Sequence, residues 1–353
     1  MLHGGDTVGY RHTYGREPLD FSANVNPLGV PEGVQRAIAE AFAHADRYPD
    51  PPCRDLCARI AQAEDIPTEW VLCGNGAADL IYRVVLAQRP LRALLPSPSF
   101  AEYEQALALA GCDVRHHALL PEDSFAATQT LVDALAHERY DIVFLCNPNN
   151  PTGLLIEPAL MAQMLETCAR TGTLMVMDEC FMGFVANAGR HTVRRQLENH
   201  ANLLVLDAFT KRYGMAGIRL GYALCSDTSL LARMDRAGAP WSVSSLAQAA
   251  GMAALAAQDY LAQTMALIGQ ERAFLRRELT ALGLDVLSGE ANYLFVRTTI
   301  EDLGERLRQQ GIMIRGCANY RGLDDTYYRM AVRTRPENLA LLQALSNAGL
   351  QER

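Results

Sequence analysis

The sequence predicts an α/β protein with a mostly parallel, seven-stranded sheet flanked by helices, accompanied by a smaller α+β domain. Two observations predict this fold class. From about residue 70, short apolar runs alternate with segments of helical periodicity, which is typical of a parallel sheet covered on both faces. After about residue 240, one long helical stretch is followed by short strands and a further helix.

The candidate strands of the sheet are apolar runs too short for helices. They are residues 71–73, 93–95, 113–116, 142–146, 174–177, 203–206 and 220–224, with helical periodicity at 77–86, 102–110 and 158–170 between them. The later region predicts a helix over 244–282, strands near 292–297 and 329–333, and a helix around 301–310. We therefore expect a large domain at residues 46–240 and a small domain formed by residues 1–45 and 241–353.

Composition excludes several classes of function. The net charge of −8 disfavours nucleic acid and anionic membranes as partners. No segment approaches the roughly 20 uninterrupted apolar residues of a membrane span, and the first residues do not resemble a secretory signal. The nine cysteines are an odd number without zinc-site spacing, which favours reduced, buried thiols and no metal site. These features predict a cytoplasmic protein.

Lysine is almost absent from this chain. Lysine and arginine together number 32, and Lys211 is the only lysine. Arginine can carry surface charge in place of lysine, but its guanidinium stays protonated and cannot form an imine. Lys211 is therefore a candidate for covalent chemistry, although a single lysine could also survive by chance.

Polar residues follow four of the predicted strands, and ligands of open α/β sheets collect beyond the carboxyl ends of the strands. Gly74-Asn75-Gly76 could cradle a phosphate at a helix N-terminus, or could be simply a tight turn. Asn150 could donate to a phenolate oxygen or serve only its proline-rich turn. Asp178 could face a protonated pyridine nitrogen, cap a helix or pair with an arginine. Lys211 follows the last of these four strands, at residues 203–206. A phosphate cradle, a donor to a phenolate oxygen, a partner for a pyridine nitrogen and an imine-forming lysine are together what binding of pyridoxal 5′-phosphate requires.

The motifs at these turns also carry a resemblance. Asn149-Asn150-Pro151-Thr152-Gly153, Asp178-Glu179 and the segment Thr210-Lys211-Arg212-Tyr213-Gly214-Met215-Ala216-Gly217-Ile218-Arg219 resemble the fold-type-I, class I/II aminotransferase-like enzymes that use pyridoxal 5′-phosphate. The resemblance covers essentially the whole chain. It is strongest to the histidinol-phosphate aminotransferase branch, and within that branch to the threonine-phosphate decarboxylases of cobalamin synthesis. Phe21-Ser22-Ala23-Asn24-Val25-Asn26-Pro27-Leu28-Gly29 and Tyr327-Tyr328-Arg329 are among the segments that point there.

The resemblance implies a role for individual residues. Lys211 would form the Schiff base, Asp178 would partner the pyridine nitrogen, Asn150 would bond the ring oxygen O3′, and Tyr103 would stack on the ring. Arg219, Thr210 and the backbone of Gly74, Asn75, Gly76 and Ala77 would hold the phosphate. Tyr48 would reach the cofactor of a second subunit, which implies a homodimer with shared active sites. Arg329 and Arg315 would bind the anionic groups of the substrate, and the same motifs place His3, Asn26 and Gly29 at the substrate. For Arg329 the alternative is a surface charge on an edge strand.

Two positions depart from the family pattern. Ala208 stands where aminotransferases commonly have a serine that bonds the cofactor phosphate, a loss that Thr210 could offset. Phe181 replaces the usual tyrosine that donates to O3′, a change that favours decarboxylation over transamination.

We therefore expect decarboxylation of a small phosphorylated amino acid, L-threonine O-3-phosphate, to (R)-1-amino-2-propanol O-2-phosphate. Three alternatives stay open at this point. They are transamination of histidinol phosphate, decarboxylation of L-serine O-phosphate, and a non-catalytic regulator or carrier that binds the cofactor.

Overall fold

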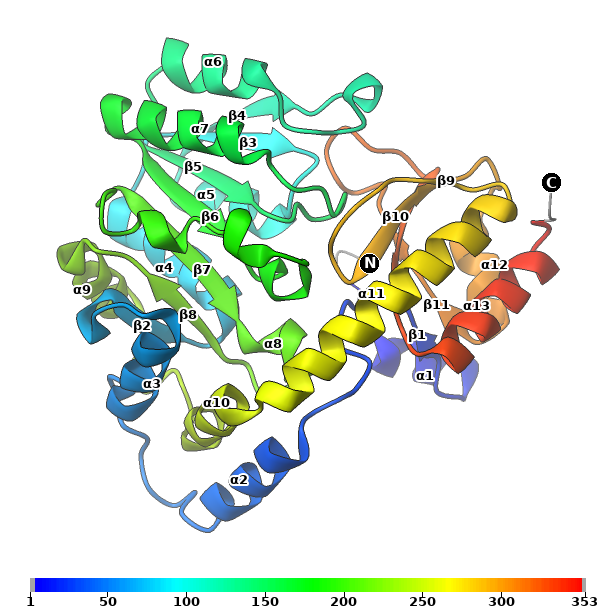
Figure 1. Ribbon diagram of the computed structural model, residues 1–353, viewed down its shortest axis with the longest axis horizontal. Helices are drawn as coiled ribbons and strands as arrows, with labels where there is room; N and C mark the ends of the chain where they lie inside the picture. Colours follow the sequence, from blue (N-terminus) through cyan, green and yellow to red (C-terminus); the bar gives the residue numbers. More distant parts are fainter. Residues whose placement is uncertain (1–3, 351–353) are drawn as a thin grey trace.

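The computed structural model describes residues 4–350 and contains a larger part built on a seven-stranded sheet and a smaller part built on a four-stranded sheet (Figure 1). The larger sheet has the order β2-β8-β7-β6-β5-β3-β4, and β8 runs antiparallel to both of its neighbours. All seven predicted strands are present, and the predicted fold class is confirmed. The strands are β2 (Val71–Gly74), β3 (Arg92–Ser97), β4 (Asp113–Ala118), β5 (Ile142–Cys146), β6 (Leu174–Asp178), β7 (Leu203–Ala208) and β8 (Gly221–Leu224).

Helices cover both faces of this sheet, which explains why every residue of β5, β6, β7 and β8 is buried. Successive residues of a strand point to opposite faces. Val143 and Leu145 pack in the core beneath α3, α6, α7 and α10, whereas Phe144 packs in the core beneath α4, α5 and α9. These helices are α3 (Arg54–Glu64), α4 (Gly76–Gln88), α5 (Ala101–Leu109), α6 (Gln129–His137), α7 (Pro158–Thr171), α9 (Thr228–Ala237) and α10 (Ser245–Ala256).

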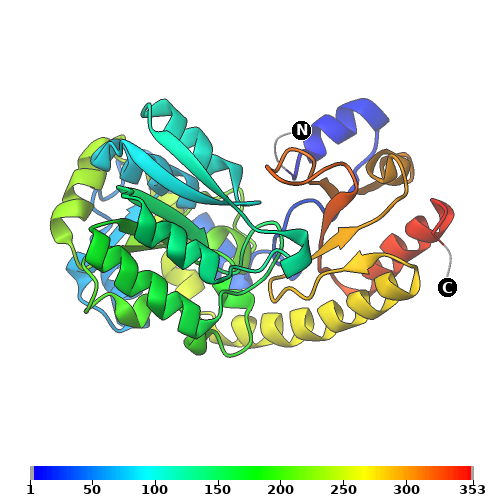
Figure 2. The same ribbon diagram turned by 90° about the horizontal axis from the view of Figure 1, so that it is seen from above.

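The smaller part is an antiparallel sheet of order β12-β13-β10-β9, packed against helices, with a two-stranded pair of β1 and β11 beside it. Its core contains Phe21, Leu275 and Leu341. The long helix α11 runs from the larger part along the smaller one (Figure 2). The elements are α1 (Thr7–Tyr14), β1 (Leu19–Asp20), α11 (Gln258–Ala281), β9 (Asp285–Val286), β10 (Tyr293–Arg297), α12 (Leu303–Gln309), β11 (Ile312–Met313), β12 (Arg315–Gly316), β13 (Tyr327–Ala331) and α13 (Arg335–Asn347).

The predicted single helix over residues 244–282 is wrong at Ala257, whose backbone (φ −86°, ψ 61°) leaves the helical region and separates α10 from α11. α10 and α2 (Glu32–Phe42) pack on the core of the larger sheet, where Ala247 and Val34 are buried. The predicted division places both helices in the small domain. That division remains a prediction, and the packing favours assigning α2 and α10 to the larger part.

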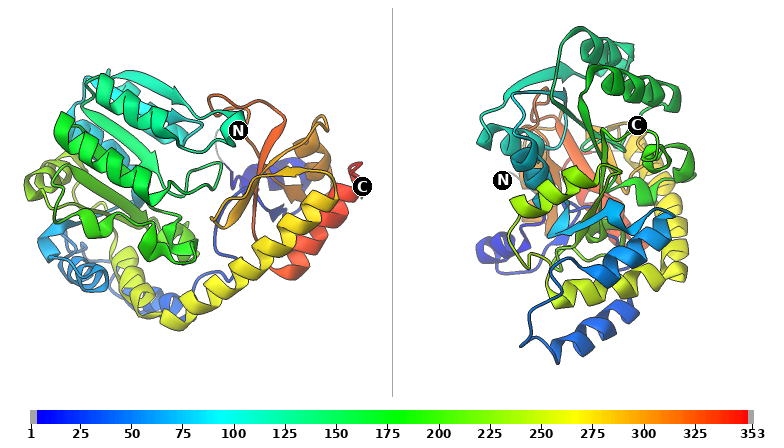
Figure 3. Two further views of the ribbon diagram at one scale, coloured as in Figure 1. Left: turned by 45° about the horizontal axis from the view of Figure 1, so that its top comes forward. Right: turned by 90° about the vertical axis from the view of Figure 1, so that its left-hand side faces the viewer.

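The N-terminal segment contacts both parts, because the Asn26 N–H donates to the Lys211 carbonyl of the larger part at 3.1 Å. β1 pairs in parallel with β11, and the backbone carbonyl of Phe21 accepts from Ala331 of β13. The carboxyl ends of β6 and β7 face this segment across the boundary between the parts (Figure 3). Among residues 4–350, no helix is both long and apolar enough to cross a membrane.

Candidate active site

A cavity of about 230 Å³ lies at this boundary. Its walls come from both parts of the chain, as expected for a ligand site beyond the carboxyl ends of parallel strands. The lining includes Ala77, Phe100, Asn150, Asp178, Phe181, Thr210, Lys211 and Arg219 from the larger part, and Gly4, Asn24, Tyr320 and Arg329 from the smaller part.

Lys211 enters the cavity from the short helix α8 (Phe209–Arg212), which begins directly after β7. The main chain is held there by Asn26, whose N–H donates to the Lys211 carbonyl at 3.1 Å and whose Nδ2 donates to the Arg212 carbonyl at 2.7 Å. Burial, together with the positive charge of Arg329, lowers the pKa of Lys211 from 10.5 to about 8. The neutral amine, which is the nucleophile, is therefore far more populated near neutral pH than for an ordinary lysine.

Asp178 is the last residue of β6 and is 5% exposed. Burial raises the pKa of its carboxyl, while hydrogen bonds from Tyr103 and from the Cys180 N–H oppose the rise. The Tyr103 hydroxyl donates to Oδ2 at 2.6 Å, and the Cys180 N–H donates to Oδ1 at 3.0 Å. These bonds orient the carboxyl and favour its charged form.

The stacking role implied for Tyr103 needs correction. Tyr103 is fully buried behind Asp178, where its ring stacks on Phe144 with a centroid separation of 4.9 Å. Phe100, three residues earlier, is the aromatic residue of this segment that lines the cavity. α5 begins at Ala101, so Phe100 lies just outside the helix while Tyr103 turns toward the sheet.

Asn150 and Arg329 contact each other inside the cavity. Asn150 Oδ1 accepts from Arg329 and, at 3.3 Å, from the Tyr320 hydroxyl. Its Nδ2 group has no acceptor among residues 4–350 and is therefore left to donate to a bound molecule. Arg329 is 7% exposed, so the alternative of a surface charge on an edge strand is wrong.

The predicted phosphate cradle lies at the start of α4. Gly76 has φ +80°, a conformation that glycine adopts without strain, and a Cβ built there would lie 2.7 Å from the Arg219 guanidinium. A Cβ at Gly221 would likewise lie 2.7 Å from the Ala77 nitrogen. The main chain and one guanidinium thus converge on a point near the positive end of a helix, which suits an anion. Asn75 stabilises this turn, because its Nδ2 donates to the Ser242 carbonyl at 3.0 Å.

Other predicted residues lie outside the cavity. Asn26 contacts the main chain after Lys211 and also donates from Nδ2 to Thr264, and Gly29 lies against Gly214 in a turn, so neither lines the site. Arg315 lines an adjoining cavity of about 130 Å³ that shares Gly4 and Ser22 with the first. His3 lies outside the described residues.

Tyr48 is 81% exposed and stacks on Trp241 with a centroid separation of 4.6 Å, away from its own chain's cavity. Its contact with a second subunit stays a prediction.

The sequence reasoning missed Asn24 as a site residue. Asn24 lines the cavity and is 1% exposed, yet neither its Oδ1 nor its Nδ2 has a hydrogen-bond partner among residues 4–350. A buried amide without partners is costly in a protein interior, so its position in a cavity marks it as a group awaiting a ligand. Its only sequence signal was its place in the segment Phe21 to Gly29.

The residues around the cavity fit pyridoxal 5′-phosphate. Lys211, the only lysine, lines the cavity together with the buried Asp178 and with Asn150, whose amide nitrogen can donate to a ligand. Gly76 and Arg219 lie close together where the phosphate would bind. A fold and a site of this kind define a pyridoxal 5′-phosphate-dependent enzyme.

Comparison with known proteins agrees. Residues 16–345 match the family model "Aminotransferase class I and II", and the chain belongs to that family. It is 39% identical over 351 residues to the threonine-phosphate decarboxylase of Salmonella typhimurium, covering 98% of this chain and 96% of the relative. It is 32% identical to a histidinol-phosphate aminotransferase of Symbiobacterium thermophilum, covering 94% and 90%. The crystal structure of the histidinol-phosphate aminotransferase from Clostridium acetobutylicum superimposes with a TM-score of 0.87 at 28% identity, covering 93% and 98%.

Proposed function

We propose that the protein is a decarboxylase that converts L-threonine O-3-phosphate to (R)-1-amino-2-propanol O-2-phosphate and CO₂. The observation that carries the proposal is the pairing of Arg315 with Arg329. The two residues are direct partners across the β12–β13 ladder and are 6% and 7% exposed. Like charges directly opposite each other on one face of a sheet repel. A substrate with both a carboxylate and a phosphate supplies two anions to such a pair.

The relatives supply the second support. The Salmonella relative is named a threonine-phosphate decarboxylase and matches nearly the full length of both chains. Phe181 lines the cavity and has no hydroxyl to donate to the O3′ position, which leaves Asn150 as the donor there.

Pyridoxal 5′-phosphate, when bound, accepts the electron pair of the bond that breaks at the substrate Cα. Lys211 would hold the cofactor through Nζ and would supply a proton to the substrate Cα. Asp178 would keep the ring nitrogen protonated, and Asn150 Nδ2 would donate to O3′. Thr210, Arg219 and the N–H groups of Gly76 and Ala77 would bind the phosphate.

The arginines decide which bond breaks. Which bond to Cα breaks would depend on how the substrate carboxylate is held. Arg329 lies beside Asn150 in the cavity and would bind that carboxylate. We assign the substrate phosphate to Arg315, which lines the adjoining cavity and also donates to Asn319 Oδ1 at 2.8 Å.

We further infer a homodimer with shared active sites. The exposed stack of Tyr48 on Trp241 is a rigid aromatic surface of the kind found in protein interfaces. In that assembly Tyr48 reaches the cofactor phosphate of the neighbouring subunit. The enzyme acts in the cytoplasm, on the pathway to the cobalamin nucleotide loop.

The second candidate is an aminotransferase acting on histidinol phosphate, as in the Symbiobacterium relative's name. Histidinol phosphate has a phosphate but no carboxylate, so it supplies only one of the two anions that L-threonine O-3-phosphate supplies. Decarboxylation of L-serine O-phosphate remains a variant of the first candidate, because one methyl group contributes only about 1–3 kcal/mol to discrimination.

The test mixes the purified, cofactor-loaded protein with L-threonine O-3-phosphate in the absence of any 2-oxoacid and measures CO₂ and the amine phosphate. Sustained release of both supports the decarboxylase, and kcat/KM for the threonine and serine esters then ranks the two substrates. Absence of CO₂, with conversion of the cofactor to its pyridoxamine form by histidinol phosphate, makes the protein an aminotransferase. Lys211→Ala is the control variant and should lose both turnover and the visible absorbance of the bound cofactor.

A further inference from the structure

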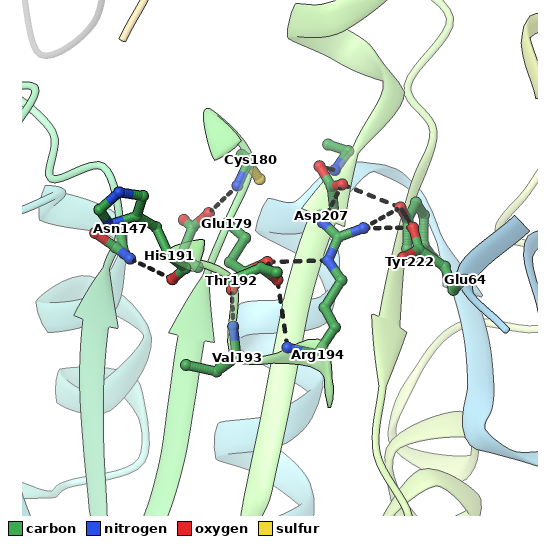
Figure 4. A network of polar contacts seen from close by, with 12 residues as sticks. Glu64, Asn147, Glu179, Cys180, His191, Thr192, Val193, Arg194, Asp207 and Tyr222 are labelled. Atoms are coloured by element: carbon green, nitrogen blue, oxygen red, sulfur yellow. Dashed lines mark hydrogen bonds and ion pairs between the residues drawn. The ribbon is translucent and has the colours of Figure 1, made fainter. Parts of the chain in front are cut away.

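A buried ionic network includes Glu179 and Asp207, each of which is next in the chain to a residue that lines the cavity, and no step proposed above uses it (Figure 4). At its centre is Arg194, whose side chain is 13% exposed. Arg194 is the first residue of a short helical turn, Arg194–Gln196, between β6 and β7. Three carboxylates contact its guanidinium. Arg194 Nε donates to Glu179 at 2.9 Å, one terminal nitrogen donates to Asp207 at 2.6 Å, and the other donates to Glu64.

The carboxylates come from segments that carry the proposed catalytic groups. Glu179 directly follows Asp178 in the chain, and its side chain is fully buried. Besides Arg194, it accepts from the Thr192 hydroxyl at 2.7 Å and from the Val193 N–H at 2.8 Å. The residue next to Asp178 is therefore fixed to the Arg194 segment through three hydrogen bonds.

Asp207 makes the equivalent connection on the lysine side. It lies in β7, and its Oδ1 accepts from the N–H of Ala208 at 2.6 Å, where the strand ends. Its Oδ2 accepts from Arg194 and also lies 3.7 Å from the guanidinium of Arg212, the residue after Lys211. The Arg194 guanidinium therefore connects Glu179, which follows Asp178 in the chain, to Asp207. Asp207 in turn contacts Ala208 and Arg212, which lie before and after Lys211.

Stability alone does not explain such a network. Burying several charges costs desolvation energy, and well-packed apolar residues often stabilise a fold equally well. What an arginine adds is geometry, because its donors are held in a rigid planar fork, whereas a lysine ammonium is a single point charge on a flexible stem.

We propose that Arg194 is a positioning residue that sets the separation between Asp178 and Lys211, and thereby the orientation of the cofactor ring. This inference rests on the proposed roles of those two residues. Small displacements of groups that hold reactants can cost about 100-fold in rate. The expected signature of Arg194 substitutions is therefore altered cofactor geometry in a protein that still folds.

The test compares Arg194→Lys and Arg194→Met with a matched pair, Arg335→Lys and Arg335→Met. Arg335 also binds a buried glutamate, Glu271, through Nε at 3.1 and 3.0 Å, but in the smaller part of the chain and outside the cavity. Five quantities are measured for each variant: the melting temperature without cofactor, the dissociation constant for pyridoxal 5′-phosphate, the visible circular dichroism of the bound ring, kcat and KM.

We expect Arg194→Lys to fold, to bind the cofactor about tenfold more weakly, to change the visible circular dichroism, and to lose about 10- to 100-fold in kcat with little change in KM. The Arg335 variants should change only the melting temperature. If Arg194→Met does not fold, the Arg194→Lys variant alone tests whether Arg194 is a positioning residue. Arg194→Lys with wild-type dichroism, cofactor affinity and kcat would overturn the proposal and leave Arg194 a purely structural residue. A wild-type protein that develops no visible absorbance with the cofactor would instead refute the proposed function.

Discussion

The hydroxyl of Tyr103 donates a 2.6 Å hydrogen bond to Asp178, the residue that we place at the cofactor's ring nitrogen. Both groups are buried, so the bond acts in a medium of low polarizability and favours the ionised carboxylate. Without it, the pKa of Asp178 would rise further above its ordinary range, and the carboxylate would compete better for the ring proton.

Tyr103→Phe tests this relationship. We expect kcat to fall by about tenfold, which corresponds to roughly one pKa unit at Asp178, and the free energy of unfolding to fall by about 1.5–3 kcal/mol, as for a hydrogen bond to a charged group. Steady-state kinetics and chemical denaturation provide the two numbers. Tyr10→Phe is the control, because the Tyr10 hydroxyl donates at 2.6 Å to the Arg308 carbonyl, outside the cavity that contains Asp178. Arg308 lines the adjoining cavity, so the two variants are compared by kcat and not by KM. Tyr10→Phe should lose stability without losing kcat, and an equal loss of kcat in both would contradict the assignment.

The strands and the turns after them could be predicted because both signals are local. An apolar run predicts a buried strand, and the rule that ligands collect at carboxyl ends then selects Asp178, Asn150 and Lys211 without knowledge of any long-range contact. Tyr103 could not be placed in this way. Phe100 and Tyr103 are three residues apart, and which one faces the cavity depends on where α5 begins.

Asn24 and Arg194 were beyond sequence reasoning for a different reason. Asn24 reaches the cavity because β1 pairs with β11, about 290 residues later in the chain. Arg194 is one of many arginines in the sequence, and only the packing of β6, β7 and α3 around it distinguishes it from a surface charge.

Asn24→Leu should weaken substrate binding without lowering the stability of the protein. The substitution removes a buried amide that has no partner among residues 4–350 and keeps nearly the same shape, so the ligand-free protein should melt at the same temperature or higher. The substrate loses a hydrogen-bond partner, so KM should rise by roughly tenfold. Asn338→Leu is the comparison, because Asn338 Nδ2 donates to Glu271 at 2.9 Å and to the Arg333 carbonyl at 2.8 Å, and its loss should lower the melting temperature. A clear drop in the melting temperature of Asn24→Leu would show that the amide has a structural role instead.

The pKa of Lys211 predicts how the cofactor-free enzyme responds to pH. The folded protein releases this proton at a pH of about 8, whereas the ordinary value for lysine is 10.5. Between these values the unfolded chain holds a proton that the folded chain has lost, so the stability of the cofactor-free protein should rise with pH across this window. The rate of cofactor capture should rise with the neutral amine and reach half of its maximum near pH 8. Stopped-flow absorbance at a series of pH values measures it.

Arg329→Met provides the check on the cause of that pKa. Arg329 is the largest charge contribution lowering the pKa of Lys211, so its removal should move the midpoint of cofactor capture to higher pH. An unchanged midpoint would mean that burial alone determines it, and a wild-type midpoint near 10.5 would contradict the lowered pKa altogether.

Arg315 and Arg329 should be separable by ligands that each lack one anion. L-Threonine has the carboxylate without the phosphate, and 1-amino-2-propanol phosphate has the phosphate without the carboxylate. Removing one member of a buried charge pair typically costs about 2–5 kcal/mol, so each substitution to methionine should weaken its own ligand by on the order of 100-fold. We expect Arg315→Met to lose affinity for the amine phosphate and Arg329→Met to lose affinity for threonine, measured as inhibition constants against the full substrate. Equal losses for both ligands in both variants would mean that the arginines, which are direct neighbours across the β12–β13 ladder, bind a single anion together. That result would remove the structural argument for a substrate with two anions and would favour histidinol phosphate.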